Sequence, residues 1–291
     1  MRILLLCPLL AACQSSIPCN QGGLPNLDPA PLLADVRVLA SPEMNGRRPG
    51  TPGHQHAEDY IRSRFAGLGY QVLTQAVPQG GDNIIAYRGQ PRIWLLAHYD
   101  HLGVGFPGAD DNASGVAVLL ALAARYQGDI AFIATDSEEE GLYGAKALLA
   151  APPLPLPKLV INFDMVGHGP VLYAAGTHDN PGFKPLVLAL AKDAPLCLRI
   201  GHDRREQQRG SAQMTDWRNA SDHAPFRKAG IPYLYFGNDV HADYHQRSDV
   251  ASHIRPDFLA GVAETALELL NRLDDKGLAP WQGNENGGKH E

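Results

Sequence analysis

The sequence is poor in cysteine and shows no excess of basic residues. Its 291 residues include four cysteines, and none of these stands in a Cys-x-x-Cys spacing, so a thiolate metal site is not indicated. Lys and Arg together number 25 against 31 Asp and Glu, which gives a formal net charge of -6 at pH 7. A general nucleic-acid-binding protein would need a basic face. We therefore expect no nucleic-acid partner.

The chain also lacks internal repeats and a second apolar segment that could enter a membrane. A hydrophobic content of 44% is enough for a chain of this length to bury one sizeable core. We expect a single folded domain over residues 28–275. A tether rich in Ser, Pro, Gly and Asn (13–27) precedes this domain, and a flexible tail (276–291) follows it.

The N-terminus reads MRILLLCPLLAAC, which is one basic residue and a short apolar run that ends in Cys13. The run is too short for a stable membrane-spanning helix, and residues 10–13 (LAAC) resemble the end of a bacterial lipoprotein signal. In such signals the peptidase cuts before the cysteine, which then receives lipid. We therefore expect residues 1–12 to be a signal peptide and Cys13 to be a lipid anchor. A buried N-terminal strand is the alternative reading.

Gln14 rather than Asp follows the anchor cysteine, which resembles the pattern for sorting to the outer membrane. We expect the protein in the bacterial cell envelope, anchored to the outer membrane and facing the periplasm. Cys7 would then be removed and Cys13 acylated. Cys19 and Cys197 would remain in an oxidising compartment, where they could form a disulfide.

Apolar strand-like runs alternate with helical patterns through the rest of the chain. The runs are IWLLA (93–97), IAFIAT (130–135), KLVINF (158–163) and IPYLYF (231–236), with helices expected at 115–126 and around 182–192. Strands that are apolar at successive positions are buried on both faces. The pattern therefore predicts an α/β protein with three α/β/α layers and a largely parallel, mixed central sheet.

Each of these strands is followed by potential metal ligands. His98 and Asp100 follow the first run, the acidic stretch DSEEEG (136–141) follows the second, Asp164 follows the third, and His245 lies within ten residues of the fourth. Sites in open α/β sheets form at the carboxyl ends of strands. Imidazole and carboxylate are ligands that Zn²⁺ takes, and a cation would offset the charge of the crowded acids.

Six motifs in order make the pattern specific. They are AHYDHLG, GADDNASG, EEEGLYG, NFDMVG, SDHAPF and YHQRSD, and the segment LASPEMNGRRPGTPG precedes them at 39–53. In this order they resemble the M28 family of zinc aminopeptidases over roughly residues 32–270. The resemblance implies the zinc-aminopeptidase (phosphorylase/hydrolase-like) architecture and a centre with two Zn²⁺ ions.

The family pattern implies a role for each motif residue. His98 and Asp164 resemble the ligands of one zinc ion, Glu139 and His245 those of the other, and Asp111 resembles the bridging carboxylate. Asp100 matches the carboxylate that lies behind the histidine of the first zinc ion.

Glu138 matches the general base, which takes a proton from the attacking water and passes it to the leaving amine. The family usually has an apolar residue after the Glu-Glu pair, where this chain has Glu140. The Gly141-Leu142 that follows favours Glu138 and Glu139 as the pair. Tyr244 is the candidate donor to the oxyanion, with Tyr99 as the second choice.

The histidines outside the ligand pattern have less specific readings. His101, His223 and His241 lie near the motifs and could line the pocket, and His168 could either contact substrate or lie in an exposed loop. The others are expected in surface or packing positions: His54, His56, His178, His202, His253 and His290.

We expect a peptidase that releases N-terminal amino acids from peptides with a free N-terminus, and several alternatives compete with this reading. M20-like amidohydrolases insert a lid domain before the last histidine, and the segment from Asp164 to His245 leaves no room for it. Glutaminyl cyclases share the fold but hold one zinc ion, whereas both ligand pairs are complete here. A carboxypeptidase-like M28 relative and a catalytically dead, lipid-anchored binding protein are the remaining alternatives, although a binding protein has no need of Glu138.

Replacing Cys13 with Ala tests the predicted anchor. Without the thiol there is no acceptor for the lipid, so the variant should leave the membrane fraction or remain unprocessed. Fractionation and mass spectrometry of the mature N-terminus provide the measurement. Wild-type protein that is soluble in the periplasm and starts at another residue would show the lipoprotein reading to be wrong.

Overall fold

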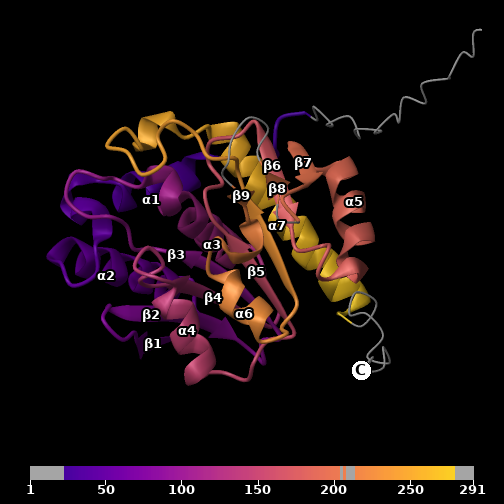
Figure 1. The fold of residues 1–291 in the computed structure, drawn as a ribbon, viewed down its shortest axis with the longest axis horizontal. Helices are drawn as coiled ribbons and strands as arrows, with labels where there is room; N and C mark the ends of the chain where they lie inside the picture. The colour runs from indigo at the N-terminus through magenta and orange to yellow at the C-terminus, as the bar shows by residue number, and fades with distance from the viewer. Residues whose placement is uncertain (1–22, 204–205, 208–213, 279–291) are drawn as a thin grey trace, which may run out of the picture.

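The computed structural model describes residues 23–203, 206–207 and 214–278. It has a largely parallel, mixed eight-stranded sheet between two layers of helices, which confirms the predicted fold class (Figure 1). The predicted signal peptide, Cys13, Cys19 and most of the predicted tail lie outside the described residues. What the sequence indicates about these segments therefore stays a prediction.

The main sheet has the strand order β1-β2-β4-β3-β5-β10-β6-β7. The four strands β4, β3, β5 and β10 are parallel neighbours, whereas β1, β2 and β6 pair with antiparallel partners. A two-stranded sheet, β8-β9, is separate. The strands are β1 Gln71–Ala76, β2 Asp82–Arg88, β3 Ile93–His98, β4 Ile130–Thr135, β5 Leu159–Phe163, β6 Val171–Ala175, β7 Cys197–Ile200, β8 Glu206–Gln207, β9 Met214–Thr215 and β10 Tyr233–Gly237.

Seven α-helices accompany these strands in the described part of the chain. They are α1 Ala30–Leu39, α2 Pro52–Gly67, α3 Gly115–Ala123, α4 Tyr143–Ala150, α5 Lys184–Asp193, α6 His223–Lys228 and α7 Pro256–Lys276. Five short segments are 3-10 or π helical: η1 Pro42–Arg47, η2 Ala109–Ser114, η3 Pro181–Phe183, η4 Trp217–Asn219 and η5 Ala251–His253. None of the described helices combines the length and apolar character that crossing a membrane requires.

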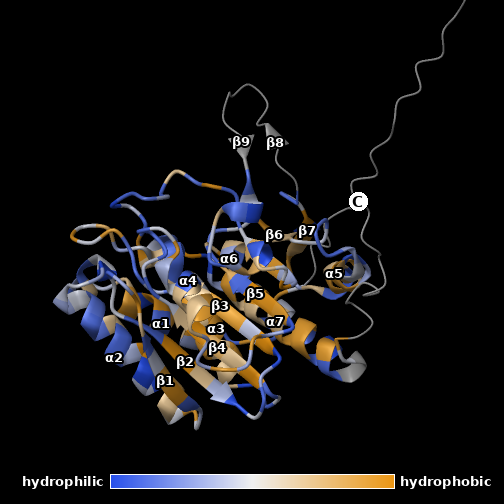
Figure 2. Ribbon diagram, turned by 60° about the horizontal axis from the view of Figure 1, so that its bottom comes forward, coloured by the Kyte–Doolittle hydropathy of each residue, from blue (hydrophilic) through white to orange (hydrophobic). Residues whose placement is uncertain are grey.

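The core lies on both faces of the sheet. Every residue of β3, β4, β5 and β10 is buried, as their continuous apolar sequences predict. Helices α1, α2, α3, α5 and α7 pack on one face and α4 and α6 on the other. Figure 2 shows hydrophobic residues along the central strands and α3, while α2 carries many hydrophilic ones. The carboxyl ends of four buried parallel strands therefore meet at one edge of the sheet.

The end of the predicted tether contacts the domain. The backbone N–H groups of Asn26 and Leu27 donate to a carboxylate oxygen of Glu264 on α7, at 2.6 and 3.0 Å. Leu27 itself is buried. These contacts fix the end of the tether to the domain at residues 26 and 27. Cys197, the first residue of β7, is disulfide-bonded, and its predicted partner Cys19 is not among the described residues.

Arg47, in η1, is fully buried and joins four distant carbonyl groups. Its guanidinium donates to the backbone oxygens of Leu39 at 2.6 Å, Tyr99 at 2.7 Å, Pro107 at 2.6 Å and Gly108 at 2.8 Å. Burial lowers the pKa of Arg47 to about 10 although nearby carboxylates oppose the shift, so it stays protonated at neutral pH. A planar guanidinium can bind several carbonyls at once. Arg47 therefore fixes the loop between β3 and α3.

Replacing Arg47 with Met should destabilise the fold strongly. The change keeps the length of the side chain but leaves buried carbonyls without donors, and each unpaired buried acceptor costs about 1–3 kcal/mol. The free energy of unfolding in urea should fall by at least about 3 kcal/mol. Arg48→Met is the matched control, because Arg48 is largely exposed and should change stability little. Similar losses in the two variants would contradict the anchoring role of Arg47.

Candidate active site

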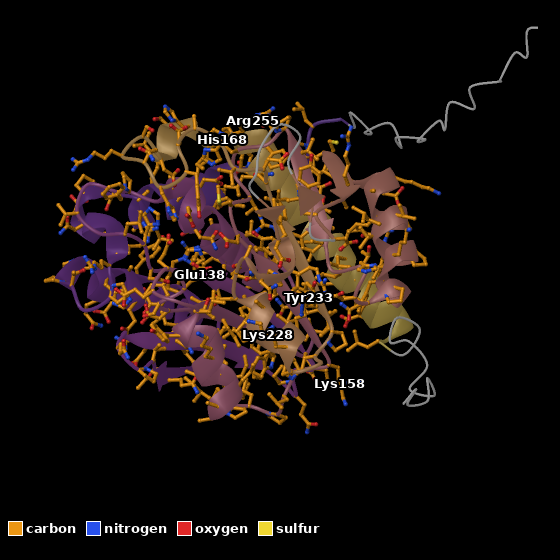
Figure 3. The ribbon with its side chains drawn as sticks, viewed as in Figure 1. Glu138, Lys158, His168, Lys228, Tyr233 and Arg255 are labelled. Carbon is orange, nitrogen blue, oxygen red and sulfur yellow. The ribbon has the colours of Figure 1, made fainter. Side chains whose placement is uncertain are left out.

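The predicted site residues come together at the carboxyl edge of the parallel strands. His98 is the last residue of β3, Glu138 and Glu139 follow β4, and Asp164 follows β5. His245 lies in the connection between β10 and α7, and Asp111 lies in η2. Figure 3 labels Glu138 in this part of the molecule. Because the four strands are parallel neighbours, residues far apart in sequence share one site.

Asp111 lies between two histidines. Its Oδ1 is 3.2 Å from Nε2 of His98, and its Oδ2 is 3.1 Å from Nε2 of His245. Oδ1 of Asp164 lies 3.3 Å from the same atom of His98, and Oε2 of Glu139 lies 3.2 Å from that of His245. The five predicted ligands thus form two imidazole–carboxylate groups that share Asp111.

These groups fit a divalent cation. The Nε2 atom of His245 is buried and makes no well-formed hydrogen bond, although it faces two carboxylates. The carboxylates of Asp111 and Glu139 raise the pKa of His245 to about 10. The position between these two carboxylates therefore favours a positive charge. Potential ligand atoms of His98, Asp111 and Asp164 all lie within 4.8 Å of one another. Imidazole with carboxylate is a donor set suited to Zn²⁺.

A third histidine, His101, lies behind Glu139. Its Nδ1 is 2.8 Å from Oε1 of Glu139, whereas His245 faces the other oxygen. His101, Asp111 and Glu139 also form a group whose ligand atoms lie within 4.8 Å. We assign His101 to holding Glu139, because its Nδ1 contacts that carboxylate, whereas Nε2 of His245 faces both Glu139 and Asp111. His101 is not among the residues that line the cavity, so the expectation that it lines the pocket is wrong.

Asp100 holds the acidic loop in place. Its Oδ1 accepts the N–H of Glu138 at 3.0 Å, and its Oδ2 accepts that of Glu139 at 3.2 Å. The residue also lies behind His98, as predicted, with its backbone oxygen 3.2 Å and its Oδ1 3.6 Å from Nδ1 of His98. One buried carboxylate thus positions both the predicted ligand His98 and the predicted base.

The two members of the Glu-Glu pair differ from the glutamate that follows. Glu138 and Glu139 line the cavity, whereas Glu140 is exposed and lies 3.8 Å from Nε of Arg48. Burial raises the pKa of Glu138 well above its usual value, and neighbouring carboxylates add to the shift while His98 opposes it. The structure therefore places Glu138 and Glu139, and not Glu140, where the predicted register requires them.

The tyrosines near the site have different environments. Tyr244 lines the cavity and stacks on His245 with ring centroids 3.8 Å apart. Tyr99 is fully buried and its hydroxyl donates to the backbone oxygen of Asp82 at 2.8 Å, so it is not available to an oxyanion. Tyr235, on β10, also lines the cavity and was not predicted. No described residue accepts a hydrogen bond from the hydroxyl of Tyr244 or Tyr235.

Two supporting residues escaped the sequence prediction. Asp249 accepts the N–H of Asp110 at 2.8 Å and that of Asp111 at 3.1 Å, which fixes the backbone of the shared carboxylate. Asn112 donates to the backbone oxygen of Phe163 at 2.9 Å and so ties η2 to the end of β5. Asn112 stands in the motif GADDNASG and Asp249 in the motif YHQRSD, so their place in these motifs is the sequence signal that could have indicated them.

Asp222, in the motif SDHAPF, is a further missed residue. It is fully buried, one of its oxygens accepts from Thr135, and the other has no hydrogen-bond partner among the described residues. Burial raises its pKa to about 7, and His98 opposes the shift. The next residue, His223, is buried against the backbone oxygen of Trp217, and burial lowers its pKa to about 3. His223 is therefore a neutral packing residue and not part of the pocket wall.

The cavity over the two ligand groups is small. It measures about 90 Å³, and four of the residues that line it carry carboxylates. Apolar and aromatic residues make up much of the remaining wall, and these include Met165, Trp217, Ala220, Tyr235 and Val240. Neither His168 nor His241 is among the lining residues, so the expectation that His241 faces the pocket is wrong.

Comparison with known proteins gives both sequence relatives and structural neighbours. The alkaline phosphatase isozyme conversion protein of Escherichia coli (strain K12) is 28% identical over 71% of this chain and 79% of its own length. Aminopeptidase YwaD of Bacillus subtilis (strain 168) is also 28% identical, over 75% of this chain. The chain spans only 50% of that relative.

Solved structures show the same fold at lower identity. BSAP, a zinc aminopeptidase from Bacillus subtilis, has a TM-score of 0.69 and 17% identity, covering 84% of this chain and 95% of its own. Porphyromonas gingivalis glutaminyl cyclase has a TM-score of 0.68 and 23% identity, covering 84% of this chain and 98% of its own. The model of peptidase family M28 matches residues 83–270, which is more than half of the chain. The chain therefore belongs to peptidase family M28.

Proposed function

We propose that the protein is a di-zinc aminopeptidase that removes N-terminal residues from peptides. The observation that carries this proposal is the position of Asp111, whose two oxygens face two different histidines. A carboxylate so placed can bridge two cations, one with His98 and Asp164 and the other with Glu139 and His245. The count of two ions is part of the proposal.

The residues around the cavity have distinct tasks in peptide hydrolysis. Zinc held there would polarise the scissile carbonyl and lower the pKa of the attacking water. Glu138 accepts the proton of that water and delivers it to the leaving amine. Its raised pKa suits a group that must both take and give a proton. The hydroxyl of Tyr244 donates to the oxyanion, because Tyr244 lines the cavity, stacks on the predicted ligand His245 and has no acceptor in the described protein.

The described cavity offers no lysine or arginine side chain to a carboxylate at the end of the substrate. Neither residue type occurs among the described residues that line it. A carboxypeptidase needs a cationic partner for the C-terminal carboxylate of its substrate. The apolar residues that line the cavity favour an apolar first side chain. The relative named as an aminopeptidase agrees with this choice.

Removal of metal should abolish activity reversibly. Dialysis against EDTA or 1,10-phenanthroline should remove turnover of Leu- and Ala-p-nitroanilide, and added Zn²⁺ should restore it, because none of the described residues that line the cavity is a serine, cysteine or threonine. Turnover and zinc content measured on the same samples provide the test. Full activity in a verifiably metal-free sample would rule out the proposal.

The same assay distinguishes the alternatives through its substrates. N-acetylated peptides should resist cleavage, since they lack the free amine. Cleavage of blocked peptides from the C-terminus would indicate a carboxypeptidase instead. Cyclisation of N-terminal glutamine without hydrolysis of other peptides would indicate a glutaminyl cyclase, the class to which one structural neighbour belongs.

Substitution of the adjacent glutamates should separate catalysis from metal binding. Glu138→Gln keeps the shape but cannot accept a proton, so kcat should fall by about 10²- to 10⁴-fold while metal content is unchanged. Glu139→Gln weakens a predicted ligand, so zinc content and activity should fall together. Metal analysis and steady-state kinetics on both variants give the measurement.

Glu140→Gln is the matched control for this pair. Glu140 is exposed and does not line the cavity, so the change should affect neither zinc content nor kcat. If Glu140→Gln lost activity with metal retained while Glu138→Gln stayed active, the base and the ligand would instead be Glu139 and Glu140.

A further inference from the structure

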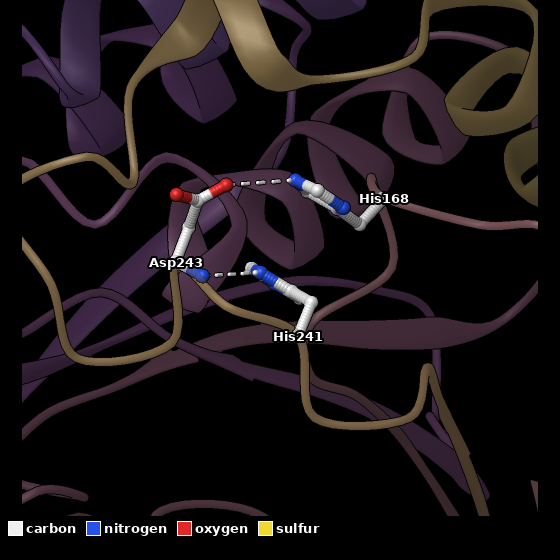
Figure 4. Close-up of side chains that lie close together, drawn as sticks. All are labelled: His168, His241 and Asp243. Atoms are coloured by element: carbon white, nitrogen blue, oxygen red, sulfur yellow. Dashed lines mark hydrogen bonds and ion pairs between the residues drawn. The ribbon is translucent and has the colours of Figure 1, made fainter.

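A second group of potential ligands lies outside the cavity. His168 belongs to the connection between β5 and β6, and His241 and Asp243 belong to the connection between β10 and α7. Potential ligand atoms of these three residues lie within 4.8 Å of one another. Figure 4 shows the ring of His168 directed toward the carboxylate of Asp243 and the ring of His241 directed toward its backbone N–H. In Figure 3, His168 lies well apart from Glu138.

His241 is oriented in the manner of a metal-binding histidine. Its Nε2 lies 2.8 Å from Oδ2 of Asp110, a fully buried carboxylate. This nitrogen therefore carries the proton, and the lone pair lies on Nδ1, which accepts the N–H of Asp243 at 3.2 Å. Metal-binding histidines almost always donate their second nitrogen to a carboxylate, carbonyl or water, which fixes the tautomer. Asp110 provides that contact here.

His168 offers a ligand atom that the protein leaves without a hydrogen bond. Its Nε2 is buried and makes no hydrogen bond to a described residue, and it lies 3.4 Å from Oδ2 of Asp243. The corresponding distances in the active site are 3.2 and 3.3 Å, from His98 to Asp111 and Asp164. Nitrogen and oxygen ligands about 2.0–2.2 Å from one tetrahedral zinc ion are separated by roughly this distance.

We propose that His168, His241 and Asp243 form an accessory binding site for Zn²⁺, separate from the active site. Two imidazoles and one carboxylate leave one position of a tetrahedral ion for water. His253 lies beside the site, with Nδ1 3.1 Å from the same carboxylate oxygen of Asp243. The inference does not depend on the aminopeptidase activity, because it concerns metal binding at residues that do not line the cavity.

Binding requires a local movement of one ring. The imidazoles of His168 and His241 are stacked, with centroids 3.8 Å apart and planes inclined by 4°. An ion cannot lie in the planes of two parallel rings, so one ring must rotate out of the stack. His241 is held at both nitrogens, whereas no hydrogen bond holds Nε2 of His168. His168 is therefore the ring that rotates onto the ion, and the ion would take the place of the N–H of Asp243 at Nδ1 of His241.

An ion at this site would join two loops that flank the active site. His168 lies four residues after the predicted ligand Asp164, and Asp243 lies two residues before His245. The site would therefore fix the segment that carries Tyr244 and His245 against the loop after β5. Because a metal that binds only the folded state stabilises it, zinc at this site should raise the unfolding temperature.

The test compares full-length wild type, His168→Ala and His178→Ala. Each protein is equilibrated with buffered Zn²⁺ at rising free concentration, and zinc per chain and the unfolding temperature are measured. His178 is exposed and makes no contact with the cluster, so it is the matched control. Wild type and His178→Ala should bind one more zinc per chain than His168→Ala. The affinity lost should exceed the 10- to 100-fold cost typical of an outer-shell partner.

Turnover shows whether the active site is intact in the variant, and a second variant covers the case in which the first does not fold. His168→Ala should retain its remaining zinc and its kcat at low free zinc, because His168 does not line the cavity. Equal zinc binding and equal thermal shifts in wild type and His168→Ala would overturn the proposal, and so would a variant that loses all its zinc with its activity. If the Ala variant does not fold, His168→Gln removes the imidazole with less loss of volume, and the same comparison then decides.

Discussion

Carboxylates that share one cavity repel one another, and much of the molecule is arranged around this constraint. Asp111, Glu138, Glu139 and Asp164 all line a cavity of about 90 Å³. Burying such charges is unfavourable unless opposite charge is present. Two divalent cations would offset the repulsion, and the two histidines complete the donor set. The same crowding that makes the site expensive to fold therefore gives it affinity for metal.

The protein holds this crowded site from behind. Asp100 and Asp249 direct their carboxylates at backbone N–H groups, so they position Glu138, Glu139 and Asp111 without adding a charge to the cavity wall. A carboxylate that accepts N–H donors is stabilised by them. Side chains whose backbone is fixed in this way need to move little when substrate binds. A site with such fixed polar groups is electrostatically preorganised.

The sequence predicted the parts of the site that local pattern determines. Continuous apolar runs predicted the four buried strands, and the topology of a parallel sheet then brought His98, Asp164 and the acidic loop together. The resemblance to family M28 supplied the register of Glu138 and Glu139, which the structure places at the cavity. Their roles as base and ligand remain predictions.

Other features depend on contacts between distant residues and were not predictable. Strands β1, β2 and β6, which lie outside the four central strands, are less continuously apolar, so no apolar run in the sequence predicted them. Tyr99 adjoins a ligand in sequence, yet its hydroxyl is committed to Asp82. Trp217 and Val240, which line the cavity, lie in segments that connect the main strands and helices. Hydrophobic periodicity in the sequence does not predict the path of such segments.

The position of Arg47 has a consequence for where the folding unit begins. The family model matches from residue 83, but Arg47 and helices α1 and α2 lie before that point. A fragment that began at residue 83 would leave the carbonyls of Tyr99, Pro107 and Gly108 without their donor and expose the apolar face that α1 and α2 cover. The match to the family model is thus shorter than the described folded domain, and residues before the match contribute to the geometry of the site.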